Sequence, residues 1–226
     1  MPNLAVSTTM LRTLPLFSRL ADADLIDLIP RIQHRSYRRH TLMLRAGEKS
    51  DALYTIVSGK AKILIDDGEG REVTLTTIGS GEFFGEMSFA DEQPRSASVE
   101  AMEACEVLYM PRVAFLECLQ HNFDAAMYML TVAVGRLRQA DQKIASLALM
   151  DVRGRVARLL IDFAHDVDGM CIVDIGSEEI ARMVGASREM VSRVVKEMAD
   201  SGLVKRHKRK IIVLDRTSLP QSGAVH

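Results

Sequence analysis

The sequence lacks the features of a membrane-spanning, disulfide-rich or zinc-ribbon protein. None of its 226 residues belong to an apolar run of about 18, and Arg12, Arg19 and Asp22 interrupt the stretch where a targeting segment would lie. The three cysteines are an odd number without any Cys-x-x-Cys pair, which disfavours a disulfide framework or a zinc site. We therefore expect a cytoplasmic protein with reduced thiols and no membrane partner.

A large net charge is also absent, because the chain carries only −1. The charge is unevenly distributed, however. Residues 1–150 carry 16 Lys and Arg against 19 Asp and Glu, whereas residues 181–226 carry 10 against 4. The basic C-terminal end has the charge that contact with nucleic acid phosphates requires.

The first half of the chain predicts a domain of β-strands. A short helix is expected from Asp22 to Ile32, and residues 38–110 then contain apolar runs such as Leu53–Val57 and Ala61–Ile65. Glycines separate these runs at intervals that suit tight turns. This pattern is typical of a compact antiparallel roll or barrel.

A long helix is predicted from Arg112 to Ala148, where Gly135 is the one helix-breaking residue. A stripe of positions recurs along it with alternating spacings of four and three residues, and all but Asp141 are apolar: Leu130, Val134, Leu137, Asp141, Ile144 and Ala148. Such a stripe is typical of a coiled-coil seam. Packing on the helix's own domain is the alternative, but the length favours pairing with a second copy of the chain.

The C-terminal part begins with a second helix for which Asp151 is the expected N-cap, and residues 149–151 are the expected hinge. His165 to Met170 is interpreted as a turn, and Cys171–Val173 as a short strand. These boundaries divide the chain into a β-strand domain with an N-terminal helix (1–110), a long helix and hinge that would pair with a second copy (111–150), and a C-terminal domain (151–226).

Two short helices joined by a tight turn predict a helix-turn-helix. Ser177 is the expected N-cap of the first, Gly185 permits the left-handed turn, and Ser187 caps the second, which runs from Arg188 to about Asp200. The second helix would bury an apolar face of Val191, Val194, Val195 and Met198. Charged and polar side chains would then point outward, where arginine donates to guanine, glutamate accepts from cytosine, and lysine and serine bind phosphates.

Residues 205–210 are basic and lie between two apolar segments, 203–204 and 211–214. Two apolar strands joined by a basic tip predict the wing of a winged helix, whose basic side chains would contact phosphates. A solvated hairpin is the alternative, but its place beside a recognition helix favours contact with DNA. The candidate DNA-binding residues are Ser177, Ser187, Arg188, Glu189, Ser192, Arg193, Lys196, Lys208 and Arg209.

A second candidate site lies in the first domain, at Gly81–Ser88 followed by Arg95–Ser98. Gly85 lets backbone N–H groups approach an anion, and a short helix from Glu86 would point its positive end at that anion. Arg95 offers a planar fork for phosphate oxygens, Ser96 adds donors, and Glu86 accepts from a ribose hydroxyl. A structural salt bridge within the roll is the alternative. Phosphate donors beside a carboxylate acceptor together indicate a phosphate-bearing ligand with hydroxyl donors, such as a nucleotide.

These motifs give the chain a resemblance to the cAMP receptor protein/fumarate-nitrate regulator family over residues 15–215. The residues that carry it are Gly85-Glu86, Arg95-Ser96-Ala97, Ala104-Cys105-Glu106-Val107, Leu149-Met150-Asp151-Val152 and Val184–Glu189. The resemblance implies an α+β fold with a jelly-roll-like cyclic-nucleotide-binding β-roll, a long dimerisation helix and a C-terminal winged helix-turn-helix. It also implies a homodimer that binds palindromic double-stranded DNA and contacts RNA polymerase.

The family pattern places the cyclic nucleotide in the β-roll against the long helix. The effector-binding candidates are Gly85, Glu86, Met87, Ser88, Arg95, Ser96, Ala97, Arg136, Ala140 and Asp141. Ala140 and Asp141 stand where cAMP-binding members carry a threonine and a serine that contact adenine. We expect cAMP first, with cGMP or cyclic di-GMP as alternatives, because a carboxylate accepts from the N1–H and N2–H groups of guanine. For Asp141 itself, an exposed polar residue that sets the coiled-coil register is the alternative.

Other functions are less compatible with the residues. The first cysteine is Cys105 and no histidine lies between His40 and His121, which disfavours an iron–sulfur cluster and a haem in the roll. Glu86 and Arg95 have no evident nucleophile partner, so no enzyme is expected. The alternatives that stay open are a regulator that binds DNA without a nucleotide effector, and a cyclic-nucleotide-binding module that does not act on DNA.

Overall fold

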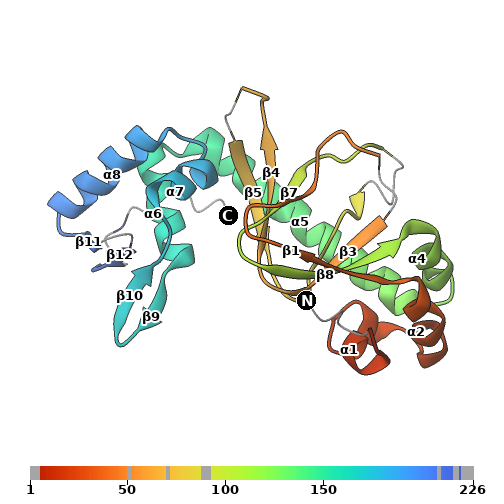
Figure 1. Ribbon diagram of the computed structural model, residues 1–226. Helices are drawn as coiled ribbons and strands as arrows, with labels where there is room; N and C mark the ends of the chain where they lie inside the picture. Colours follow the sequence, from red (N-terminus) through yellow and green to blue (C-terminus); the bar gives the residue numbers. More distant parts are fainter. Residues whose placement is uncertain are drawn as a thin grey trace. The chain divides into compact units, whose positions relative to one another are not determined.

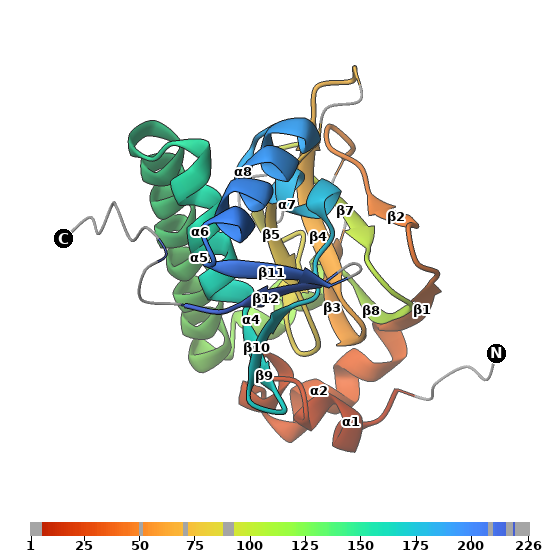
Figure 2. The same cartoon turned by 90° about the vertical axis from the view of Figure 1, so that its left-hand side faces the viewer.

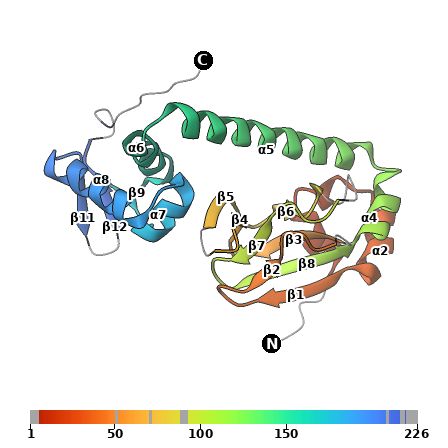
Figure 3. The ribbon, with the colours of Figure 1, turned by 90° about the horizontal axis from the view of Figure 1, so that it is seen from above.

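The computed structural model describes residues 6–49, 52–69, 72–87, 93–207, 210–215 and 219. The chain divides into two compact units, Met1–Arg136 and Leu137–His226. One helix, α5 (Phe123–Leu149), begins in the first unit and ends in the second, and Figure 3 shows it as one uninterrupted helix. Among the described residues, no helix is both long and apolar enough to cross a membrane.

The first unit contains two four-stranded antiparallel sheets, with strand orders β1-β8-β3-β6 and β2-β7-β4-β5. Their strands are β1 (Gln33–Tyr37), β2 (Leu42–Leu44), β3 (Ala52–Ser58), β4 (Ala61–Asp66), β5 (Glu72–Ile78), β6 (Phe83–Phe84), β7 (Ser98–Ala101) and β8 (Cys105–Pro111). One apolar core joins the two sheets and includes Tyr54 and Phe84, whose rings stack 5.1 Å apart. This arrangement confirms the predicted β-roll.

Helices cover one end of the roll: α1 (Thr8–Arg12), η1 (Phe17–Arg19), α2 (Asp22–Leu28), η2 (Ile29–Arg31) and α4 (Arg112–Leu119) (Figure 1). They bury a second core that includes Phe17, Phe83 and Phe115. The sequence predicted the helix from Asp22, but α1 and η1 were not predicted.

The prediction of one continuous helix from Arg112 to Ala148 was wrong. α4 ends at Leu119, and α5 begins at Phe123. The buried Asn122 amide explains the break, because its Nδ2 donates to the Cys118 carbonyl and to Asp24 Oδ2, both at 2.7 Å, while its Oδ1 accepts from Ala21 N at 3.2 Å. A side chain that bonds to the preceding turn and to another helix replaces the bonds that a continuous helix would make.

The second unit contains α6 (Val152–Phe163), α7 (Ser177–Val184), α8 (Arg188–Asp200) and a sheet of order β11-β12-β10-β9. Its strands are β9 (His165–Val167), β10 (Met170–Val173), β11 (Val204–His207) and β12 (Lys210–Val213), with β11 and β12 side by side in Figure 2. The predicted turn at His165–Met170 was too long, since this segment also supplies β9 and the start of β10. The hairpin turns at Asp168 and Gly169, which both have positive φ.

Local caps in this unit follow the sequence with one exception. Asp151 Oδ1 accepts from Gly154 N at 2.7 Å, and Ser187 Oγ accepts from Met190 N at 3.2 Å, so both predicted N-caps are confirmed. Gly185 ends α7 with φ +65°, as the turn requires. Ser177, however, is the first helical residue, and Gly176 occupies the N-cap without a side-chain bond.

Candidate functional site: an anion cassette and a DNA-reading face

The cassette residues of the first unit surround one pocket. Of the predicted residues, Gly85, Glu86, Met87, Arg95, Ser96 and Ala97 line it, together with the apolar side chains of Leu44, Ile63, Phe84 and Val99. The apolar wall was not predicted, although Ile63 lies in the predicted run Ala61–Ile65 and Phe84 in the candidate stretch Gly81–Ser88. Ser88 lies outside the described residues.

Arg95 is held firmly at the floor of this pocket. Its side chain is 5% exposed, its Nη1 donates to the Gly85 carbonyl at 2.8 Å, and its Nη2 donates to the Ala52 carbonyl at 2.9 Å. Gly85 has φ +86°, and a Cβ atom there would lie 2.3 Å from Arg95 Nη1. Glycine at 85 is therefore required by both the backbone and the guanidinium beside it.

Glu86 connects the pocket to α5. Its Oε1 lies 2.6 Å from Arg136 Nη1, and Arg136 also donates to the Phe83 carbonyl at 2.5 Å. The structure thus brings Arg136 to the cassette, as predicted. Ala140 and Asp141 do not line this pocket. Both are exposed on α5 and belong to the second compact unit.

The pocket is small, with a volume of about 50 Å³. Pockets that bind small molecules typically have volumes of about 300–1,000 Å³. Met87, which is 57% exposed, accepts a bond from the Ser96 hydroxyl to its sulfur at 3.4 Å and partly covers the site. The hollow that the described residues line is therefore smaller than a typical small-molecule site.

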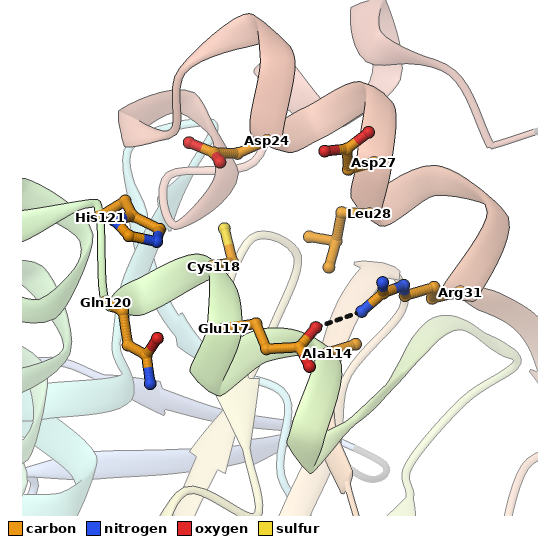
Figure 4. A pocket seen from close by; sticks show the side chains of 9 residues that line it. All are labelled: Asp24, Asp27, Leu28, Arg31, Ala114, Glu117, Cys118, Gln120 and His121. Atoms are coloured by element: carbon orange, nitrogen blue, oxygen red, sulfur yellow. Dashed lines mark hydrogen bonds and ion pairs between the residues drawn. The ribbon is translucent and has the colours of Figure 1, made fainter.

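A larger hollow of about 250 Å³ lies between α2 and α4 (Figure 4). Two of its carboxylates have partners in the chain, since Glu117 pairs with Arg31 at 2.5 Å and Asp24 accepts from Asn122. Burial and the nearby Asp24 carboxylate raise the pKa of the Cys118 thiol to about 11, so this cysteine is protonated and unreactive near neutral pH. Within the described part of the chain, no three metal-ligating side chains are grouped to hold an ion.

The three cysteines are free, with Cys105 and Cys118 buried and Cys171 half-buried. Burial is the main cause that raises the pKa of Cys105, with a contribution from the Glu103 carboxylate.

The second unit presents the predicted face of α8. Val191, Val194, Val195 and Met198 are buried in the core of this unit, as predicted. The helix consequently exposes Arg188, Glu189, Arg193 and Lys196, with Ser192 half-buried beside them. The Ser187 hydroxyl is already used as the cap of α8, and Ser177 is half-buried in the first turn of α7.

The wing is a hairpin of β11 and β12, with register pairs from Val204↔Val213 to His207↔Lys210. The predicted basic tip was too long, because Lys205, Arg206 and His207 belong to β11 and Lys210 begins β12. All four are exposed, and Lys210 lies 3.4 Å from Asp174. Lys208 and Arg209 lie outside the described residues.

Comparison with known proteins matches both halves of the chain. Residues 34–122 match the family of cyclic nucleotide-binding domains, and residues 154–221 match the Crp-like helix-turn-helix domain. The chain belongs to the CRP/FNR family of transcription regulators. It is a DNA-binding transcription regulator with a cyclic nucleotide-binding domain and is not an enzyme.

Similar proteins include two named as cAMP-activated global transcriptional regulators: Vfr of Pseudomonas aeruginosa, 37% identical over 186 residues, and CRP of Salmonella typhimurium, 37% identical over 183 residues. Each alignment covers 78% of this chain and 87% of the relative. Among solved structures, the c-di-GMP-responsive regulator CLP of Xanthomonas campestris is 26% identical with a TM-score of 0.74. That match covers 86% of this chain and 100% of CLP.

Proposed function

We propose that this CRP/FNR family member is a homodimeric regulator whose binding to a palindromic operator is controlled by a cyclic nucleotide in the β-roll. The observation that carries the proposal is the ion pair between Glu86 and Arg136. It joins the pocket directly to α5, the helix that we assign to dimerisation. A ligand hydroxyl that binds Glu86 would compete with Arg136 and so act on α5.

The pocket chemistry supports a cyclic nucleotide over a simple anion. Arg95 and Ser96 supply donors for the cyclic phosphate, and the backbone at Gly85 allows close approach. Glu86 is an acceptor and would be repelled by a bare anion, but it suits a ribose hydroxyl. A ligand shifts an equilibrium only when it binds two states differently, so control of DNA binding requires that the nucleotide favour one arrangement of α5.

The apolar stripe of α5 supports the homodimer. It begins at Phe123 and Met127, before the predicted start at Leu130, and keeps the spacings of four and three. The rest of the chain leaves these residues exposed to solvent, and Leu137 is 62% and Ile144 64% exposed. Such a stripe is stable in water only when a partner covers it, and a parallel copy has the matching pattern.

For the effector, cAMP is our first choice because the similar regulators Vfr and CRP are named as cAMP-activated. Cyclic di-GMP and cGMP are the alternatives. CLP is named as responsive to c-di-GMP, and Asp141 offers an acceptor for a guanine edge in place of a hydroxyl.

For DNA, we propose that Arg188, Glu189 and Arg193 contact bases in the major groove, while Ser192, Lys196 and the wing contact phosphates. Lys208 and Arg209 belong to the proposed wing contacts, and Ser177 and Ser187 to the backbone contacts at the helix starts. We also propose that the chain has three parts: an effector-binding domain (1–110), a dimerisation helix with the hinge (111–150) and a DNA-binding domain (151–226). Contact with RNA polymerase belongs to the same proposal.

Fluorescence anisotropy tests this function. An operator selected in vitro from random palindromic DNA is titrated with the protein alone and with cAMP, cGMP or cyclic di-GMP. We expect one nucleotide to raise the operator affinity by roughly 5–150-fold, the range typical of allosteric coupling. Equal affinity in all four titrations would contradict control by a nucleotide and favour a regulator that needs no effector.

A further inference from the structure

We propose that Lys143 and Arg155 form a clamp that fixes the helix-turn-helix to the end of α5 and thereby sets the spacing of the two recognition helices. This inference rests on the proposed homodimer. It assigns to both residues a positioning role in DNA recognition, distinct from contact with DNA.

The clamp acts on the C-terminal end of α7. The last carbonyls of a helix have no partner inside the helix and carry partial negative charge. Lys143 Nζ donates to the Met183 carbonyl at 2.7 Å, and Arg155 Nε donates to the Val184 carbonyl at 2.9 Å. Two cations from two different helices therefore bind adjacent carbonyls immediately before the turn at Gly185.

Arg155 also holds the hinge. Its Nη1 donates at 2.8 Å to the carbonyl of Met150, which lies between α5 and α6. One guanidinium consequently joins the hinge backbone to the end of α7. Because its fork is planar and rigid, these two bonds fix the direction in which α7 leaves the hinge.

A second contact of α5 reinforces the first. Leu147 lies one turn beyond Lys143, and a Cβ atom on Gly185 would lie 3.3 Å from Leu147 Cδ2. Burial lowers the pKa of Lys143, as expected for an amine withdrawn from water into this contact. The face of α5 with Lys143 and Leu147 therefore packs on the helix-turn-helix turn.

This face differs from the apolar stripe. Ile144 belongs to the stripe, and neighbouring residues on an α-helix point about 100° apart. The last turns of α5 thus present one face to the proposed partner and another to their own helix-turn-helix. Rotation of α5 within the dimer would be transmitted through the clamp to α7 and, across Gly185, to α8.

The clamp is separable from the folding of the DNA-binding domain. The core of that domain is apolar and includes Val156, Ile180 and Val195. Removal of the Lys143 amine should leave this core intact, so that each helix-turn-helix still binds one half-site. What should be lost is the fixed distance between two half-sites, about one turn of duplex DNA.

The test compares Lys143→Met and Arg155→Met with the wild type on four DNAs: the selected operator, versions with 2 or 5 base pairs added between half-sites, and a single half-site. All titrations contain cAMP, with cyclic di-GMP in parallel. We expect each variant to lose about tenfold in affinity for the selected operator and nothing for the half-site, since a bond from a charged donor is involved. The preference for the selected spacing should shrink by the same factor.

Lys143→Arg should retain most of the preference, and Gln142→Met, at the exposed neighbouring position of α5, should behave as wild type. Unchanged spacing preference in both Met variants would overturn the clamp. Equal loss on the half-site and the operator would also overturn it, because the residues would then merely support folding. A wild type without any spacing preference would contradict the homodimer itself.

Discussion

Gly85 and Arg95 show how single residues determine the cassette. The guanidinium of Arg95 occupies the space that any side chain at position 85 would need, and it ties β3 to the cassette through the Ala52 carbonyl. The arginine therefore has two roles, one in the packing around the pocket and one in the proposed binding of phosphate. Substitution of Arg95 itself would mix these roles, whereas substitution of Gly85 moves the guanidinium without removing it.

We predict that Gly85→Ala abolishes the rise in melting temperature that the effector causes. The new methyl group displaces Arg95 Nη1, and the positive φ costs about 1 kcal/mol in addition. Gly68→Ala is the matched control, since Gly68 has φ +73° and open space around its Cβ position. A nucleotide-induced shift of wild-type size in Gly85→Ala, measured by differential scanning fluorimetry, would contradict the assigned pocket.

At the scale of elements, the junction of α4 and α5 shows where periodicity fails as a guide. Both helices have good helix-forming residues, and nothing between Gln120 and Asn122 is a strong helix breaker. The break comes from the bonds of one buried amide to α4 and to the start of α2. The same amide thus positions the first turn of α5 on the β-roll.

We predict that Asn122→Ala lowers the free energy of unfolding by about 1–3 kcal/mol, because the buried Cys118 carbonyl and the partly buried groups at the start of α2 lose their partner. Gln120→Ala, at an exposed position of the same junction, should change it by less than about 0.5 kcal/mol. Urea unfolding followed by circular dichroism measures both. Equal stability of the two variants would show that the junction does not depend on Asn122.

At the scale of the whole molecule, the two compact units share one helix, and the proposed switch depends on a partner for that helix. The stripe of α5 passes from the β-roll unit into the DNA-binding unit. A dimer formed along it would therefore hold two pockets and two helix-turn-helix motifs in one assembly. Control by an effector then requires only a change in how the two stripes pair.

We predict that native mass spectrometry of the wild type gives twice the 25.1 kDa mass of the chain. Ile144→Glu should raise the dimer dissociation constant at least about tenfold, because two facing carboxylates would be buried. Gln142→Glu adds the same charge beside the stripe and should leave the dimer intact. A monomeric wild type, or a dimer whose dissociation constant is unchanged in Ile144→Glu, would contradict a dimer formed along the α5 stripe.

The sequence by itself determined the elements that depend on neighbours a few residues apart. The Asp151 and Ser187 caps, the left-handed Gly185 and the buried face of α8 were all predictable, because caps and helical periodicity act over one or two turns. The glycine-separated strand runs indicated the roll, and the family motifs identified the anion site within it as a cyclic-nucleotide cassette. The end of α4, the Glu86–Arg136 pair and the clamp were decided only by tertiary structure. Their partners lie many residues apart in the chain, up to 101 for Asn122 and Ala21, and only packing brings such groups within bonding distance.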